Sequence, residues 1–313
     1  MKVFSPGKIN LALNVGPKRP DGYHRVDSVF HMIELGDTLS FDTSSSLGIL
    51  CNVDLGISVQ DNLVFKAIKA FDERFNTKSN FTITINKQLM AGGGLGGGSS
   101  NAAAALYGLC KLHHINLRHP HVQEIASSLG SDVPVFLAPT GASLMGGRGE
   151  HIERSLTPAT GVPVVIAWPI GAHSNTGEVY RHFDESPTPT KSMLNLCDYL
   201  DGLIKKPRSF GEDASLLSLQ AHFLAGELYN NLSEAALRVT PEVGDVLLNL
   251  LQQPQTLGAT VSGSGACSFA LCSTHENASA LAEQCLAQGF GACATKLRAQ
   301  GVSKINGVES LYE

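Results

Sequence analysis

The chain has 313 residues, of which 43% are hydrophobic and 16% are charged, a composition typical of a folded globular protein and unlike that of a disordered one. The net charge of −5 excludes an overall basic field for nucleic acid, and no stretch approaches the roughly 18 apolar residues of a membrane span. Seven scattered cysteines without a Cys-x-x-Cys pair, and a start without an apolar signal core, predict a cytoplasmic protein with neither a nucleic-acid nor a membrane partner.

The first seventy residues predict two strands and a helix. Ile9–Val15 alternates apolar with mixed positions, as a half-buried strand does. Strand character resumes over Val26–Phe41, with an interruption expected at Gly36–Asp37. Asp61–Asn62 then has the residue types of a helix cap, and it precedes the helical run Leu63–Phe71.

A strand followed by a glycine run comes next. Phe81–Asn86 alternates strictly between apolar and polar residues, which predicts a strand. Six of the seven residues from Gly92 to Gly98 are glycine. We expect Ser99–Asn101 to cap an alanine-rich helix that begins at Ala102 and ends near Leu112.

The remainder of the chain predicts clustered helices between a few strands, with the polar, proline-rich segment 185–190 as a loop. The expected elements are helices at 121–129, 194–204, 214–224, 241–251 and 278–288, strands at 162–168 and 291–297, and a strand–glycine turn–strand unit at 257–271. Because the elements do not alternate regularly, the pattern favours an α+β fold over a doubly wound sheet. The strand at 162–168 is expected to open a second domain, which divides the chain into 1–155 and 156–313.

The glycine run has the properties of an anion-binding loop. Glycines let backbone N–H groups converge on a ligand, and the helix that follows contributes free N–H donors and a partial positive charge. Two familiar motifs do not fit. A dinucleotide site needs an acidic residue about 20 positions on, where this chain has none, and a Walker loop needs a lysine where Ser99 stands. A flexible turn without a ligand remains the structural alternative.

Gly94–Ala103 resembles the phosphate-binding motif of the GHMP kinases, a superfamily named for galactokinase, homoserine kinase, mevalonate kinase and phosphomevalonate kinase. Ser5–Leu11 and Val261–Cys267 resemble its N-terminal strand motif and its late glycine motif, so the resemblance spans essentially the whole chain. It implies a two-domain α+β fold with the active site in a cleft between the domains, with ATP as co-substrate and Mg²⁺ beside it. The implied ATP-binding residues are Met90, Ala91, Gly92, Gly93, Gly94, Leu95, Gly96, Gly97, Gly98, Ser99 and Ser100.

One branch of this superfamily is most similar. Lys8–Leu11, Arg19–His24 and Leu129–Phe136 resemble the branch that phosphorylates a cytidylated sugar alcohol in non-mevalonate isoprenoid precursor synthesis. Gly7 stands where alanine is usual in that branch, and Met90 where proline often precedes the loop. The resemblance implies transfer of the γ-phosphoryl group of ATP to the 2-hydroxyl of cytidylated methylerythritol.

The resemblance also implies roles for single residues. Asp132 is the candidate base that accepts the hydroxyl proton, with Lys8 supplying positive charge beside it. The alternative is that Asp132 only caps the short segment that begins at Val133. Asn10 shares a strand face with Lys8 and is expected to bind substrate.

Tyr23 and His24 resemble the cytidine-binding pair of the branch, an aromatic face to stack on cytosine and a polar group to bind its edge. The alternative places Tyr23 at a hairpin edge and His24 on the surface. Gly146–Gly149 predicts a hairpin turn rather than a substrate-side loop. Lys66 and Lys87 are candidates to approach the ATP phosphates, although the sequence does not place them.

Two other functions stay open on the sequence. The first is another GHMP kinase that acts on homoserine or a mevalonate derivative, neither of which carries a cytosine ring for Tyr23 and His24 to bind. The second is a non-catalytic ATP-binding sensor, which would have no need for Asp132 and Lys8. The magnesium ligands and the oligomeric state are unknown at this point.

Overall fold

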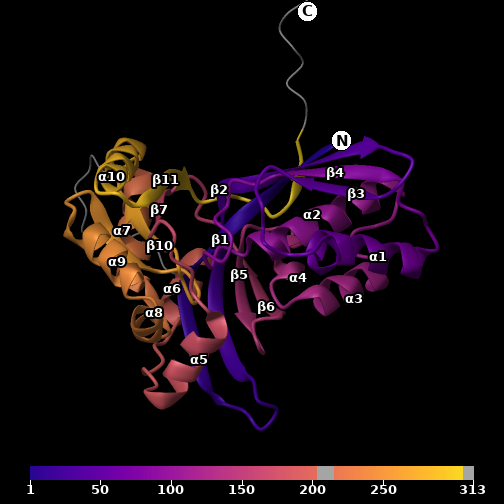
Figure 1. Ribbon diagram of the computed structural model, residues 1–313. Helices are drawn as coiled ribbons and strands as arrows, with labels where there is room; N and C mark the ends of the chain where they lie inside the picture. Colours follow the sequence, from indigo (N-terminus) through magenta and orange to yellow (C-terminus); the bar gives the residue numbers. More distant parts are fainter. Residues whose placement is uncertain (203–214, 306–313) are drawn as a thin grey trace, which may run out of the picture.

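The structure is a computed structural model that describes residues 1–202 and 215–305 (Figure 1). The strands are β1 (Lys2–Lys18), β2 (His24–Thr43), β3 (Gly48–Cys51), β4 (Phe81–Asn86), β5 (Ala142–Gly146), β6 (His151–Leu156), β7 (Pro163–Trp168), β8 (Tyr229–Asn230), β9 (Thr256–Val261), β10 (Ser268–Cys272), β11 (Gly291–Lys296) and β12 (Ser303–Lys304). The helices are α1 (Leu63–Phe75), α2 (Gly97–Leu112), α3 (Pro120–Leu129), α4 (Val133–Phe136), α5 (Thr176–Glu185), α6 (Leu194–Leu200), α7 (Leu216–Glu227), α8 (Ser233–Val239), α9 (Pro241–Gln252) and α10 (His275–Ala287).

Two separate sheets organise these elements, which confirms the α+β class. The larger sheet has eight strands in the order β12-β1-β2-β4-β3, with β5 and β6 joined to β2 and with β8 joined to β1. The smaller sheet has the order β11-β7-β10-β9, with neighbouring strands antiparallel. Helices α1 to α4 lie together beside the larger sheet, and α7, α9 and α10 surround the smaller one (Figure 1).

The predicted strand at 81–86 is confirmed over its full length, and most other predicted elements are present with ends shifted by a few residues. The part of the predicted helix 194–204 beyond residue 202, and residue 214 of the helix predicted at 214–224, lie outside the described residues. The proposed domain boundary at 155/156 falls at the end of β6. Strands β8 and β12 nevertheless return to pair with β1.

The predicted interruption of the second strand at Gly36–Asp37 is wrong. Strand β2 continues through these residues, and the irregularity is a register shift, since Pro6 pairs with Gly36 while Lys8 pairs with Met32. Because a Cβ on Gly36 would lie 2.5 Å from the carbonyl oxygen of Ser5, only glycine allows β1 to approach so closely here.

The predicted start of the alanine-rich helix is also wrong. Helix α2 begins at Gly97, and its N-cap is Gly96 in the left-handed conformation with φ 70°. Ser99–Asn101 therefore lie within the helix and do not cap it. A glycine N-cap places the first free N–H groups of the helix inside the glycine run itself.

Helix α5 was absent from the predicted elements. Asn175 caps it by accepting a hydrogen bond from the backbone N–H of Glu178, and Val179 and Phe183, four residues apart, are its buried face. The predicted loop at 185–190 is irregular from Ser186 onward. Helix α5 lies beside the far end of the β1–β2 ribbon (Figure 1).

Candidate active site

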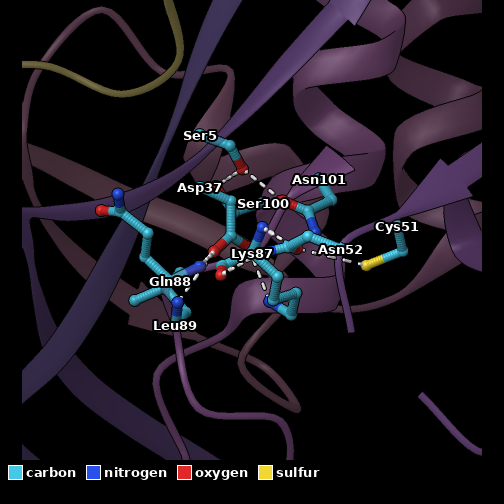
Figure 2. Close-up of polar contacts among 9 residues, drawn as sticks. All are labelled: Ser5, Asp37, Cys51, Asn52, Lys87, Gln88, Leu89, Ser100 and Asn101. Carbon is cyan, nitrogen blue, oxygen red and sulfur yellow. Dashed lines mark hydrogen bonds and ion pairs between the residues drawn. The ribbon is translucent and has the colours of Figure 1, made fainter. Parts of the chain in front are cut away.

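The glycine run lines a cavity of about 370 Å³. Residues 90–99 all contribute to its wall, together with Lys87 and Asn62, so nearly all of the predicted ATP-binding residues surround one space. Ser100 does not line it. Its side chain is buried, with its hydroxyl 2.8 Å from that of Ser5 (Figure 2). Ser100 therefore links α2 to β1 through Ser5, and Ser99 is the serine that lines the cavity.

The late glycine motif, Val261–Cys267, packs directly against this loop. The backbone N–H of Cys267 donates to the carbonyl of Gly93 at 3.1 Å, and the hydroxyl of Ser262 donates to that of Gly94 at 3.1 Å. Gly94 has φ 74°, and a Cβ there would lie 2.1 Å from the carbonyl oxygen of Ser262. The close approach therefore requires glycine at this position.

A buried ion pair stands beside the loop. Lys87 Nζ lies 2.6 Å from the carboxylate of Asp37, which is fully buried and also accepts hydrogen bonds from the backbone N–H groups of Gln88 and Leu89 (Figure 2). A Cβ on Gly97 would lie 2.9 Å from Lys87 Nζ, so this ammonium adjoins the first residue of α2. Lys66 instead forms an exposed pair with Asp61, and it does not line the cavity.

The candidate catalytic residues meet at the other side of the loop. Lys8 Nζ lies 3.9 Å from Asp132 Oδ2, and it donates a hydrogen bond to Asn10 Oδ1 at 2.8 Å. Burial lowers the pKa of Lys8, an effect that the nearby carboxylate of Asp132 partly opposes. Asp132 is the N-cap residue of α4, but its side chain makes no capping hydrogen bond and is therefore free to act in the candidate site.

A short polar chain holds Asn10 in one orientation. Asn10 Nδ2 donates to the hydroxyl of Ser28 at 2.8 Å, and this hydroxyl donates to the carbonyl oxygen of Ala12 at 2.7 Å. Both Asn10 and Ser28 are buried. The amide oxygen of Asn10 is therefore directed at Lys8, because its amino group is already bound.

Three neighbouring cavities share lining residues, and together they are called the groove below. The cavity that holds Lys8 and Asp132 measures about 280 Å³, and it shares Gly94 and Gly96 with the glycine-loop cavity. It shares Val26, Arg148 and Tyr180 with a third cavity of about 300 Å³, which is lined by Tyr23 and His24. All the sequence-predicted site residues except Ser100 and Lys66 thus adjoin this groove.

The third cavity has aromatic walls. Tyr23 is 55% exposed, and the guanidinium of Arg148 lies 4.6 Å from the centre of its ring. His24 is buried and not on the surface, with Nε2 2.7 Å from Asp184 Oδ1 and its ring centre 5.0 Å from that of Tyr180. This cavity suits a flat, polar-edged ring joined to a charged group.

Sequence reasoning missed several of these residues. Tyr180 and Asp184 come from α5, whose signals were Asn175 three residues before Glu178 and the spacing of its apolar residues. Burial, with a smaller contribution from the charge of Asp132, raises the pKa of Tyr180 to about 12, which keeps its hydroxyl neutral. Arg148 lies in the predicted turn between β5 and β6, and the structure confirms that turn while directing this side chain into the groove.

The family of the chain follows from sequence comparison. Residues 62–141 match the GHMP kinases N terminal domain, and residues 207–291 match the GHMP kinases C terminal domain. The chain therefore belongs to the GHMP kinase family, and it is an ATP-dependent small-molecule kinase with the α+β fold of that family.

Individual relatives of the chain share one enzyme name. The chain is 33% identical to the 4-diphosphocytidyl-2-C-methyl-D-erythritol kinase of Desulfitobacterium hafniense, with 90% of both chains covered. It is 32% identical to the enzyme of the same name from Chlorobium chlorochromatii, covering 90% of this chain and 92% of that one. A crystal structure of 4-(cytidine 5'-diphospho)-2C-methyl-D-erythritol kinase matches with a TM-score of 0.73 at 29% identity, covering 95% of this chain and 99% of that one.

Homoserine kinase from Cytophaga hutchinsonii matches with a TM-score of 0.66 at 18% identity, covering 97% of each chain, which shows a shared fold alone. Across residues 1–202 and 215–305, no helix combines the length and apolar character needed to cross a membrane.

Proposed function

We propose that this chain transfers the γ-phosphoryl group of ATP to the 2-hydroxyl of 4-diphosphocytidyl-2-C-methyl-D-erythritol, in non-mevalonate isoprenoid precursor synthesis. One observation carries the proposal. The three adjoining cavities of the groove hold the glycine loop, the Lys8–Asp132 pair and the aromatic walls, in the order that ATP, the reacting hydroxyl and a cytidine group would require. The relatives with this printed name support the same substrate.

In the proposed reaction, the 2-hydroxyl oxygen attacks the γ-phosphorus of ATP while its proton passes to the carboxylate of Asp132. The bond between the γ-phosphorus and the bridging oxygen breaks, and ADP leaves. Lys8, which Asn10 holds 3.9 Å from Asp132, contributes positive charge next to the developing negative charge on the substrate oxygen. The backbone N–H groups at the start of α2 hold the phosphates of ATP.

Magnesium is part of the proposal, because Mg²⁺ usually binds nucleotide phosphates with only one or two protein ligands. The described residues contain no group of three or more histidine, cysteine or acidic side chains that could form a complete metal cage. The Ser99 hydroxyl fits the smaller role, because Ser99 lines the glycine-loop cavity and its hydroxyl lies 3.9 Å from where a Cβ on Gly130 would be, two residues before Asp132 in the chain. Bound there, Mg²⁺ would neutralise phosphate charge.

The aromatic cavity separates this function from the alternatives. A kinase for homoserine or mevalonate has no base to place between Tyr23, Tyr180 and His24. A non-catalytic ATP sensor would leave the Lys8–Asp132 pair without use, and the pair is intact. We also propose the cytoplasm as the compartment, because its reducing conditions suit seven free cysteines. The boundary at 155/156 stays our proposed division between the two domains.

The test is to incubate the purified chain with ATP and Mg²⁺ and one alcohol at a time: the cytidylated methylerythritol, homoserine, mevalonate or phosphomevalonate. We expect ADP release and a new phosphomonoester signal in ³¹P NMR only with the cytidylated alcohol. Turnover of another alcohol instead would assign the chain to a different branch. ATP binding without any phosphoryl transfer would favour the sensor.

A further inference from the structure

The imidazole of His24 is held by a carboxylate from a distant helix. His24 Nε2 lies 2.7 Å from Asp184 Oδ1, and the side chain of His24 is only 6% exposed. An ionised carboxylate can only accept hydrogen bonds, so Nε2 must carry the proton whenever the ring is neutral. In a neutral imidazole the second nitrogen, Nδ1, then has a free lone pair.

Nδ1 of His24 remains available to the cavity. No residue within 1–202 and 215–305 forms a hydrogen bond with Nδ1. It is also absent from the fully buried polar atoms without a partner in this part of the chain, so Nδ1 is not sealed from solvent. It therefore keeps access to the space that His24 lines together with Tyr23 and Tyr180. The lone pair of Nδ1 is therefore a hydrogen-bond acceptor at the place where the polar edge of a nucleobase would lie.

Helix α5 also fixes the plane of the ring. The ring centre of Tyr180 lies 5.0 Å from that of His24, and Phe183 meets the imidazole edge-on at 6.3 Å. Asp184 has a second contact, since its Oδ2 lies 3.6 Å from Lys18 Nζ at the end of β1. The imidazole is therefore restrained in both its orientation and its proton position.

We propose that Asp184 is a positioning residue that makes the cavity select cytosine over uracil, an inference that rests on the proposed function. Cytosine carries an amino donor at C4, whereas uracil carries a carbonyl acceptor there. With its proton held on Nε2 by Asp184, His24 accepts from the cytosine amino group through Nδ1. The carbonyl of uracil would face the same lone pair without a proton between them, which is unfavourable.

The test uses Asp184→Asn, because a carboxamide can donate to Nε2 as well as accept from it. The imidazole proton is then free to move to Nδ1. The measurement is the ratio of kcat/KM for the cytidine and uridine forms of the diphosphate-linked alcohol, at about pH 8.5, where an imidazole is ordinarily neutral. We expect the wild-type preference for the cytidine form to fall about tenfold, the value of one hydrogen bond, with the KM for ATP unchanged.

Matched variants separate this role from simple support of the fold. Glu185→Gln changes the neighbouring carboxylate, which pairs with Arg181 and His182 on the surface, and it should leave the ratio unchanged. Asp184→Glu keeps a pure acceptor and should restore most of the preference. A merely structural role would raise the KM for both forms equally, and an unchanged ratio in Asp184→Asn would overturn the proposal.

A second measurement does not depend on turnover. ¹⁵N NMR of the imidazole nitrogens should show Nε2 protonated and Nδ1 unprotonated in the wild type, and a mixture or the opposite tautomer in Asp184→Asn. A wild-type ring protonated on Nδ1 would overturn the proposal. If neither nucleotide form is phosphorylated, the proposed substrate is wrong, and the spectrum still decides whether Asp184 places the proton.

Discussion

Lys8 Nζ lies 3.9 Å from Asp132 Oδ2, although one residue belongs to the first strand and the other precedes α4. Their exposure differs, since the side chain of Lys8 is 6% exposed and that of Asp132 is 26% exposed. The carboxylate therefore opens into the groove, while the ammonium lies beneath it, held by Asn10. This arrangement leads to the first prediction.

Asp132→Asn should lower kcat by about 10²- to 10⁴-fold, because the amide cannot accept the hydroxyl proton at the moment of transfer. Binding of both substrates should change little, since the side chain keeps its size and its opening to the groove. Steady-state kinetics together with calorimetric Kd values separate the two effects. An unchanged kcat would remove Asp132 from the role of base.

Ser28→Ala tests the polar chain that orients Asn10. It leaves Asn10 Nδ2 and the carbonyl of Ala12 buried without this partner, which should cost about 1–3 kcal/mol of unfolding free energy. It should also lower kcat about tenfold, because the amide of Asn10 is then free to turn away from Lys8.

The matched control is Ser143→Ala. Ser143 is also a buried serine, but its hydroxyl has no hydrogen-bond partner among the residues that the structure describes. We expect its removal to change the unfolding free energy by less than about 0.5 kcal/mol and to leave kcat intact. Equal effects of the two substitutions in denaturant unfolding and kinetics would show that the polar chain has no special role.

Lys87→Met tests the ion pair beside the glycine loop. It leaves the buried carboxylate of Asp37 without its cation, so we expect a loss of about 3–5 kcal/mol in stability and a higher KM for ATP. Lys66→Met, which breaks an exposed pair with Asp61, should change neither quantity measurably. A Lys87→Met enzyme with normal thermal stability and normal ATP kinetics would contradict both parts.

The lowered pKa of Lys8 predicts how the reaction depends on pH. Burial lowers its pKa, so on raising the pH it loses its proton and its charge earlier than an ordinary lysine does. If the ammonium is required, kcat/KM should fall on the alkaline side at a pH below that expected for a free lysine. Tyr180 cannot account for this limb, because its pKa is raised to about 12.

Lys8→Arg provides the check on that assignment. A guanidinium stays charged throughout the accessible range, so the alkaline limb should move to higher pH even if the rate is lower overall. A limb at the same pH in the wild type and in Lys8→Arg would assign it to another group.

The local elements of the site could be read from the sequence. The strand at 81–86 and the glycine run are specified by residues next to one another in the chain. Even there the start of α2 differed from the predicted start at Ala102, because Gly96 adopts the left-handed conformation and allows the helix to begin before Ser99. Helix α5 was missed although its cap and the spacing of Val179 and Phe183 are present in the sequence, since a short segment with only two buried apolar residues gives a weak helical pattern.

The sequence by itself determined a glycine loop that opens a helix, the local geometry of an anion-binding loop, because positive φ angles and free N–H groups at a helix start depend on neighbouring residues alone. Only the tertiary structure decided what this loop faces. Lys8, Asp132, Arg148 and Asp184 meet around one groove through strand pairing and helix packing between distant segments. Such contacts leave no fixed spacing in the chain, since their geometry comes from the whole fold.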